Sequence, residues 1–280
     1  MSGNGRALVL GGGGVAGISW LTGVLAGLAA EGADVTGADV LIGTSAGSAV
    51  AAQVGSGLPL GELFERQADP ALQNRELVPS GSATVAELAE TWMRVAEEND
   101  DPAAIRRAMG ARALAADTVD EAARRAVIEA RLPVREWPSR DLRVTAVNAL
   151  TGDLRVFDRD SGVPLVDAVA ASCAVPLIWP PVTIGGVRYV DGGVASLNNL
   201  TLAVGYERVL LIAPMDDPSL PREVAAVEEA GGRVEVIGPD EAARRAAGAD
   251  PLDPSTRTPV AHAGLAQGKA AAAGIASFWA

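Results

Sequence analysis

The stretch Val40-Leu41-Ile42-Gly43-Thr44-Ser45-Ala46-Gly47-Ser48 decides how this chain folds. An apolar run typical of a strand ends at Gly43, and an alanine-rich pattern typical of a helix begins just after Ser45. Gly-x-Ser-x-Gly at such a junction predicts a nucleophile elbow, in which a tight turn lifts the serine oxygen clear of the sheet edge. Gly43 and Gly47 suit this turn because the strand and helix backbones nearly touch there. The pattern also fits a plain corner in which Ser45 only caps the helix.

A similar strand–turn–helix unit precedes the elbow. Residues 7–10 are typical of a buried strand, glycines follow, and apolar residues then recur at helical spacing up to Gly32. Free amides at such a helix start can hold an anion. Three interpretations compete for Gly12-x-Gly14-x-x-Gly17: a dinucleotide fingerprint, a loop that stabilises the oxyanion of acyl transfer, or a turn without a ligand.

The dinucleotide interpretation requires an acidic residue at the end of the second strand, about 20 positions further on. Asp34 and Asp39 lie near that distance, but the strand over residues 40–42 runs into the elbow instead. Two adjacent parallel strands would place both turns at one sheet edge. The spacing therefore favours the oxyanion interpretation.

A helical insert is predicted at about residues 58–138. Two capping boxes, Thr84-x-x-Glu87 and Thr118-x-x-Glu121, predict helices that extend to about Glu98 and Arg131. This insert is where we expect a lid or a substrate selector.

Two groups of side chains stand out within the insert. One could line a helix face, either as a plain core stripe or as the cover of an acyl pocket: Leu88, Trp92, Met93 and Val95. The other is interpreted as solvated surface charge: Arg106, Arg107, Arg124 and Arg125.

The second half of the chain alternates strands and helices. Hairpins are predicted at residues 142–157 and 182–190, and Pro164 at a first-turn position opens a helix at residues 165–174. Further strands are expected at residues 209–213 and 233–237, and further helices at residues 222–230, 241–247 and 261–278. The second hairpin places Asp191-Gly192-Gly193 at the end of a strand. The motif is interpreted either as a plain turn or as a carboxylate directed at the sheet edge that holds the elbow. The short connections predict one domain over residues 1–280, with a mostly parallel sheet between helices.

In this order and spacing, the glycine loop, the elbow and Asp191-Gly192-Gly193 resemble the patatin-like phospholipase family. Ala171-Ser172-Cys173-Ala174-Val175-Pro176 and Pro180-Pro181-Val182 support the resemblance, which runs from about Arg6 to Pro214. It implies an α/β fold, a three-layer α/β/α sandwich, that hydrolyses lipid acyl esters with a Ser–Asp dyad.

The resemblance also implies roles for individual positions. Ser45 matches the nucleophile and Asp191 the general base. The positions expected to form the oxyanion and substrate-binding loop are Gly12, Gly13, Gly14, Gly17 and Ala46, and those that support the motifs are Gly43, Gly47, Gly192 and Gly193. The family usually has Arg or Lys just before the last glycine of the loop, whereas this chain has Ala16.

A Ser–Asp–His triad of the α/β-hydrolase type is the rival within hydrolases, and His262 is the single histidine of the chain. That fold needs several strands before its elbow, and 44 residues leave room for about two strand–helix units. A nucleotide-binding module and a catalytically silent scaffold also remain open.

The charge balance of the sequence limits the classes of molecule that the protein is expected to bind. The chain has 35 acidic against 23 basic residues and a net charge of −12. This balance argues against nucleic acid and against electrostatic adsorption to an anionic membrane, but it allows a lipid substrate and transient peripheral membrane contact. We expect no metal and no cofactor.

The location and the substrate are less closely defined by the sequence. A single cysteine, Cys173, forms no internal disulfide and is expected to be buried. No secretory signal or spanning segment is expected, which favours the cytoplasm.

The sequence leaves four classes of substrate open: phospholipid, lysophospholipid, neutral glyceride and small artificial ester. It also leaves the oligomeric state open.

Overall fold

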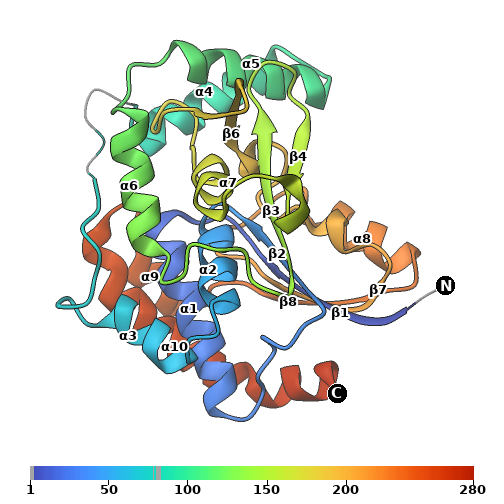
Figure 1. The fold of residues 1–280 in the computed structure, drawn as a ribbon. Coiled ribbons are helices and arrows are strands. Elements are labelled where there is room, and N and C mark those ends of the chain that lie inside the picture. The colour runs from blue at the N-terminus through green and yellow to red at the C-terminus, as the bar shows by residue number, and fades with distance from the viewer. Residues whose placement is uncertain (1–2, 78, 80–82) are drawn as a thin grey trace.

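A mixed sheet runs through the middle of the computed structural model, which describes residues 3–77, 79 and 83–280 (Figure 1). Its order within these residues is β5-β6-β3-β2-β1-β7-β8, and β4 pairs with β3 beside this path. The strands are β1 (Gly3–Leu10), β2 (Val40–Thr44), β3 (Asp141–Asn148), β4 (Leu154–Phe157), β5 (Val182–Ile184), β6 (Val187–Asp191), β7 (Tyr206–Ile212) and β8 (Arg233–Ile237). The strands from β3 through β2, β1 and β7 to β8 are parallel, and the hairpin strands β4, β5 and β6 pair antiparallel.

Helices cover both faces of this sheet. The α-helices are α1 (Gly14–Ala30), α2 (Ala46–Gly55), α3 (Leu60–Ala68), α4 (Val85–Glu97), α5 (Pro102–Ala115), α6 (Glu121–Arg131), α7 (Leu165–Ser172), α8 (Leu220–Glu229), α9 (Glu241–Ala247) and α10 (Arg257–Trp279). The short 3₁₀ helices are η1 (Arg159–Ser161), η2 (Gly192–Val194), η3 (Leu200–Ala203) and η4 (Pro254–Thr256). None of the described helices is both long and apolar enough to cross a membrane.

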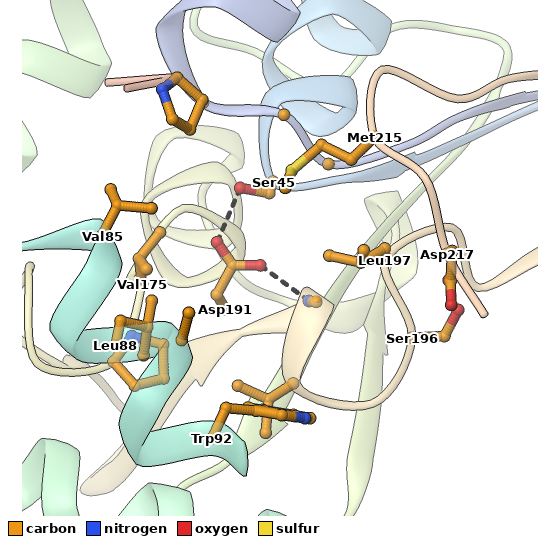
Figure 2. A pocket seen from close by; sticks show the side chains of 18 of the residues that line it. Ser45, Val85, Leu88, Trp92, Val175, Asp191, Ser196, Leu197, Met215 and Asp217 are labelled. Atoms are coloured by element: carbon orange, nitrogen blue, oxygen red, sulfur yellow. Dashed lines mark hydrogen bonds between the residues drawn. The ribbon is translucent and has the colours of Figure 1, made fainter. Parts of the chain in front are cut away.

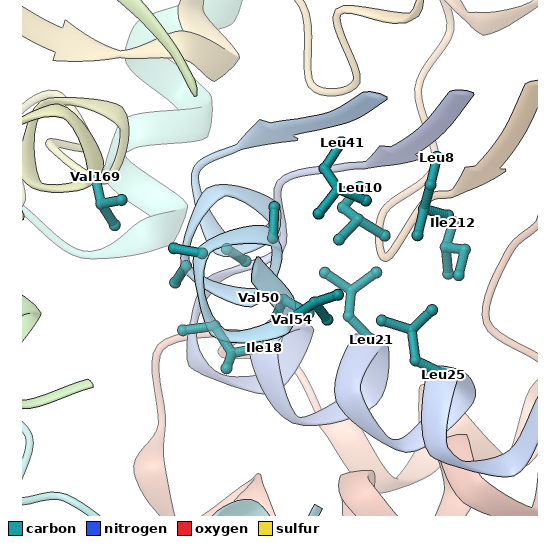
Figure 3. Close-up of a cluster of buried hydrophobic side chains, with 14 of the residues drawn as sticks. Leu8, Leu10, Ile18, Leu21, Leu25, Leu41, Val50, Val54, Val169 and Ile212 are labelled. Carbon is teal, nitrogen blue, oxygen red and sulfur yellow. The ribbon is translucent and has the colours of Figure 1, made fainter. Parts of the chain in front are cut away.

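Alternate residues of the central strands supply two separate cores. Leu8 and Leu10 of β1 belong to the cluster with residues of α1, α2, α7 and α10, whereas Ala7 and Val9 belong to the cluster with η3 and α8. Figure 3 shows strand residues such as Leu8 facing Leu21 of α1 across the first core. Because side chains alternate between the two faces of a strand, this period of two requires a layer on each side. The structure thus confirms the predicted α/β fold with a mostly parallel sheet flanked by helices.

The strand register brings three distant segments to one edge. Leu10 is the partner of Gly43, so the glycines after β1 lie beside the elbow after β2. Thr44 pairs with Thr145 on β3, and the next residue of β3, Ala146, pairs with Asp191. The elbow and the carboxylate are therefore separated by a single strand, although they are 146 positions apart in the chain.

The expected insert contains more helices than its capping boxes predicted, namely α3 to α6. Residues 78 and 80–82, which fall within it, lie outside the described residues. Thr84 caps α4 in a complete capping box with Glu87, as predicted. The box at Thr118 is wrong, because Asp120 caps α6.

Two starts of helices differ from the prediction for local reasons. The carboxylate of Asp120 accepts the N–H groups of Ala122 and Ala123, and aspartate caps at least as well as threonine. Glu121 is consequently the first residue of α6, and it accepts hydrogen bonds from Thr183 instead. Pro164 is the N-cap of α7 rather than a residue of its first turn.

The candidate active site

The elbow holds Ser45 in a strained conformation. Ser45 follows β2 and precedes α2 with φ 52° and ψ −117°, in a region that side chains rarely adopt. A Cβ at Gly43 would lie 2.5 Å from the Cα of Ser48, and one at Gly47 would lie 1.9 Å from the carbonyl oxygen of Leu10. Both glycines are thus required by close approach of backbone, which is what the sequence predicted.

Side chains at the end of α7 hold the elbow in place. The Ser45 N–H donates to Ser172 Oγ at 2.9 Å. The Ser45 carbonyl accepts from Ser48 Oγ at 2.7 Å and from Cys173 Sγ at 3.3 Å. Cys173 is buried, as expected, and burial raises the pKa of its thiol to about 11. The thiol therefore stays protonated and serves as a donor.

Ser45 and Asp191 are directly hydrogen-bonded. Ser45 Oγ donates to Asp191 Oδ2 at 2.7 Å, and the Gly193 N–H donates to Oδ1 at 2.7 Å (Figure 2). The Asp191 N–H donates to the carbonyl of Ala174 at 2.9 Å, which ties the strand end to the segment after α7. Ser45 is 8% and Asp191 4% exposed.

Burial changes the basicity of the carboxylate. It raises the pKa of Asp191 to about 7, although the hydrogen bonds from Ser45 and Gly193 and the positive charge of Arg124 lower it in part. A base with a pKa near the working pH exchanges protons most effectively. At a pH near 7 the carboxyl group of Asp191 can therefore both accept and release a proton.

The glycine loop offers fewer free amides than its sequence suggests. The Gly12 N–H donates to the carbonyl of Leu197 at 2.8 Å, and the Gly17 N–H donates to the carbonyl of Gly13 at 2.8 Å. In the part of the chain that the structure describes, the N–H groups of Gly13, Gly14 and Ala46 have no partner. These three amides therefore remain able to donate to a ligand.

Gly17 and Ala16 support the loop from behind. A Cβ at Gly17 would meet Pro214 Cβ at 3.3 Å and Ala46 Cβ at 3.4 Å, so the loop packs closely on both residues. Ala16 is buried, and its N–H donates to the carbonyl of Pro251 at 3.0 Å. The loop is therefore held by the backbone segment that precedes η4 and α10.

A cavity of about 640 Å³ opens over the Ser45–Asp191 pair. Figure 2 shows α4 with Leu88 and Trp92 on one side and Leu197 and Met215 on the other. Most of its lining is apolar: Val85, Leu88, Ala89, Trp92, Met93, Val175, Pro176, Ile178, Val194, Ala195, Leu197, Met215, Pro218, Pro251 and Leu252.

The stripe on α4 packs against the core, as one of its two interpretations required, and it also lines the cavity. Leu88, Trp92 and Met93 line the cavity. Val95 belongs to a core cluster against which Leu88 and Trp92 also pack. One helix face thus joins the cavity wall to the core beneath it.

Asn199 organises the turn after Asp191 and was not singled out from the sequence. Its Nδ2 donates to the carbonyl of Ser196 at 2.8 Å and to Thr44 Oγ1 at 3.0 Å. A Cβ at Gly192 would lie 2.2 Å from Thr145 Oγ1, so this turn packs directly on β3. An asparagine a few positions after a motif carries no sequence signal by itself, as is also true of Leu197 and Met215.

Arg124 contradicts its prediction as a solvated charge. It is 5% exposed, and its guanidinium carbon lies 3.8 Å from the ring centre of Trp179. Arg131 pairs with Glu76 at 2.6 Å, and Arg124 lies 3.9 Å from the same carboxylate. Burial lowers the pKa of Arg124 to about 9. Arg124, Ile128 and Arg131 share one buried face of α6, which is the signal that the sequence offered.

His262 lies on the exposed surface of α10, away from the lining of the cavity. Its ring packs edge-on against Phe64 at 5.4 Å between ring centres. Among the described residues, no three His, Cys, Asp or Glu side chains come together as a metal site.

Comparison with known proteins identifies the family of the chain. Residues 8–204 match the patatin-like phospholipase family, and the chain belongs to that family. The fold is similar to the crystal structure of VipD from Legionella pneumophila, with 13% identity, a TM-score of 0.51, and coverage of 98% of this chain and 67% of VipD. The type III effector protein ExoU aligns at 15% identity and a TM-score of 0.44, over 98% of this chain and 54% of ExoU. No curated protein matches the chain.

Proposed function

We propose that the protein is a serine hydrolase that cleaves lipid acyl esters, with Ser45 as nucleophile and Asp191 as general base. The observation that carries this proposal is the 2.7 Å hydrogen bond between Ser45 Oγ and Asp191 Oδ2 at the floor of an apolar cavity. A serine hydroxyl becomes a useful nucleophile when an adjacent base takes its proton.

In the first half of the reaction, Ser45 Oγ attacks the ester carbonyl carbon while its proton passes to Asp191. The carbonyl oxygen becomes an oxyanion that the free amides of Gly13, Gly14 and Ala46 stabilise, at about 3 kcal/mol for each well-placed donor. When the intermediate collapses, the bond to the alcohol oxygen breaks and that oxygen takes the proton from Asp191. The acyl group remains on Ser45.

In the second half, water attacks the acyl carbon and gives a proton to Asp191. The bond to Ser45 Oγ then breaks, the fatty acid leaves, and the proton returns to Ser45. Asp191 must be unprotonated at the start of both halves. Because burial raises its pKa to about 7, we expect activity to fall as the pH falls through about 7.

Covalent labelling with a fluorophosphonate, located by mass spectrometry, tests the nucleophile directly. We expect labelling of Ser45 in the wild-type chain, none in Ser45→Ala, and hydrolysis of p-nitrophenyl octanoate only where labelling occurs. Asp191→Asn should lose hydrolysis with the fold intact by circular dichroism, whereas His262→Ala should keep most of it.

The possible outcomes separate the alternatives. Loss of hydrolysis in His262→Ala with an active Asp191→Asn would favour the Ser–Asp–His triad. Nucleotide binding without labelling would favour a nucleotide-binding module. If the chain is neither labelled nor binds a nucleotide, a catalytically silent scaffold would be favoured.

A further inference from the structure

The charged side chains that line the cavity are all of one sign. Among the described residues, the charged side chains that line the cavity are Asp191 and Asp217, and no Arg, Lys or His does so. An anionic group beside Asp217 would therefore meet a carboxylate, with no cation among the described lining side chains.

The cations closest in sequence to the lining residues, Arg94, Arg188 and Arg222, are not themselves part of the lining. Arg94 follows Met93 on α4, but at 100° per residue it belongs with Glu87 and Glu90 on the opposite face from Leu88. Arg244 pairs with Asp216 at 3.2 Å. Asp217 forms no ion pair within the described residues, so its charge remains uncompensated beside the cavity.

Asp217 belongs to the polar side of the cavity and, among the described residues, supplies its one charged hydrogen-bond acceptor besides Asp191. Its Oδ1 accepts from the Ser219 N–H and Oγ, and its Oδ2 accepts from Asn198 Nδ2 at 3.2 Å. A carboxylate offers about four acceptor positions, so at least one remains. The hydroxyls of Ser196 and Ser219 also line this side, opposite the apolar face of α4. Such a surface binds a group that donates hydrogen bonds, as an alcohol does.

We propose that the enzyme selects esters whose head group is uncharged and carries free hydroxyls, such as a monoacylglycerol, over esters with a phosphate. This inference rests on the proposed hydrolase function and names its substrate class. The acyl chain lies against the apolar side formed by α4, and the glycerol hydroxyls donate to Asp217. A phosphate next to Asp217 is repelled.

Three lipids with the same oleoyl chain test the head group alone: monooleoylglycerol, oleoyl lysophosphatidylcholine and oleoyl lysophosphatidylglycerol, each at equal mole fraction in neutral detergent micelles. We expect kcat/KM for the anionic lipid to be about tenfold below that for monooleoylglycerol, as for one pair of like charges near a protein surface. Release of oleate is the measurement. Equal values for these two lipids would overturn the proposal.

A charge placed at the rim provides the matched variants. Met215 lines the cavity and is 39% exposed, so Met215→Lys adds a cation there without burying it. We expect this variant to raise the ratio of anionic to neutral turnover about fivefold. Met215→Gln, similar in length but uncharged, should keep the wild-type ratio, and so should Leu150→Lys, a cation at a site 69% exposed that does not line the cavity.

Turnover of p-nitrophenyl octanoate separates this inference from the function on which it rests. If that ester is not hydrolysed, the hydrolase proposal fails. If it is hydrolysed while Met215→Lys and Leu150→Lys change the ratio equally, the head-group proposal fails and the hydrolase proposal stands.

Discussion

Asp191 and Ser45 both occupy positions that are unfavourable for folding. The positive φ of Ser45 costs on the order of 1–3 kcal/mol for a residue with a side chain. The carboxylate of Asp191 is almost fully shielded from water. Two protein groups, Ser45 Oγ and the Gly193 N–H, donate hydrogen bonds to it instead. Such strain is expected at a site selected for reactivity rather than for stability.

Asp191→Asn should therefore stabilise the fold while removing activity. The pKa of Asp191 is about 7 in the folded chain and near 3.8 when exposed. The unfolded state binds fewer protons between these values, so the free energy of unfolding falls as the pH rises from about 4 to about 7 and stays low above that. An asparagine has no such charge to bury. We expect the melting temperature of the variant to exceed that of the wild type at pH 8.

The same measurement at pH 4 is the control. There the wild-type carboxyl is protonated in the folded state, and the difference in melting temperature should disappear. A variant that is less stable than the wild type at pH 8 would contradict the assignment of Asp191 as a desolvated base.

Arg124 is predicted to influence Asp191 through its charge. Its guanidinium lowers the pKa of Asp191, so Arg124→Met, which keeps a long apolar stem against Trp179, should raise that pKa further. The acidic limb of the pH–rate profile should then move to higher pH. Arg125→Met, which removes a neighbouring and more exposed charge paired with Asp167, should leave the limb unchanged. A lower plateau rate with an unmoved midpoint would mean that Arg124 is only structural.

Among the elements, α4 has little support from the core. Among the described residues of α4, Val95 is the only fully buried one. The apolar face of α4 forms a wall of the cavity. Its N-terminus is held by the reciprocal bonds between Thr84 and Glu87. A helix with so little burial depends on its cap more than a core helix does.

Thr84→Ala and Thr118→Ala form a matched pair at this scale. Thr84→Ala removes a cap that is worth about 1 kcal/mol, so the amides of the first turn of α4 should exchange several times faster with deuterium. Thr118→Ala removes no cap, because Asp120 has that role, and exchange in α6 should change little. Equal acceleration in the two helices would show that the capping assignment is wrong.

The sequence predicted the strands better than the insert. Each strand ends at a glycine or a turn signal, and the hairpins at Gly152 and at Gly185-Gly186 have the predicted antiparallel pairing. In the insert, α3 and α5 were not singled out, and Arg124 was misjudged. Charge in a sequence indicates solvent only on average, and Glu76, which accompanies Arg124 in the core, precedes it by 48 positions without any local pattern.

The sequence predicted which residues gather at the candidate site, but not which of their backbone N–H groups are free to bind a ligand. The glycine pattern pointed to the loop, yet it could not tell that Leu197 occupies the amide of Gly12 and leaves Gly13, Gly14 and Ala46 free. That distinction depends on the turn after Asp191, which meets the loop only in the folded molecule.

Across the whole molecule, the first and last helices pack at backbone distance (Figure 1). A Cβ at Gly27 of α1 would lie 2.3 Å from the carbonyl oxygen of Leu265 on α10, and one at Gly268 would lie 2.3 Å from that of Val24. Glycine lowers helix propensity, so its presence in both helices reflects this close contact.

Gly27→Ala should destabilise the fold for this reason. Overpacking costs about 1–3 kcal/mol, and alanine recovers about 1 kcal/mol of helix propensity, so the midpoint of urea unfolding should fall. Gly274→Ala on α10 is the control, since a Cβ there has nothing within 4 Å, and its midpoint should rise. If the urea midpoints of Gly27→Ala and Gly274→Ala both rose, the tight contact between α1 and α10 would be ruled out.

The pairing of α1 with α10 also fixes when the site can be completed during translation. The loop that supplies the amides begins α1, and the backbone that holds Ala16 lies at Pro251, just before α10. A ribosome adds about 5–20 residues per second, so a nascent chain spends on the order of ten seconds with the elbow made and α1 still uncovered. Esterase activity should therefore appear only once residues 257–279 have left the exit tunnel, and until then the apolar side of α1 is open to chaperones.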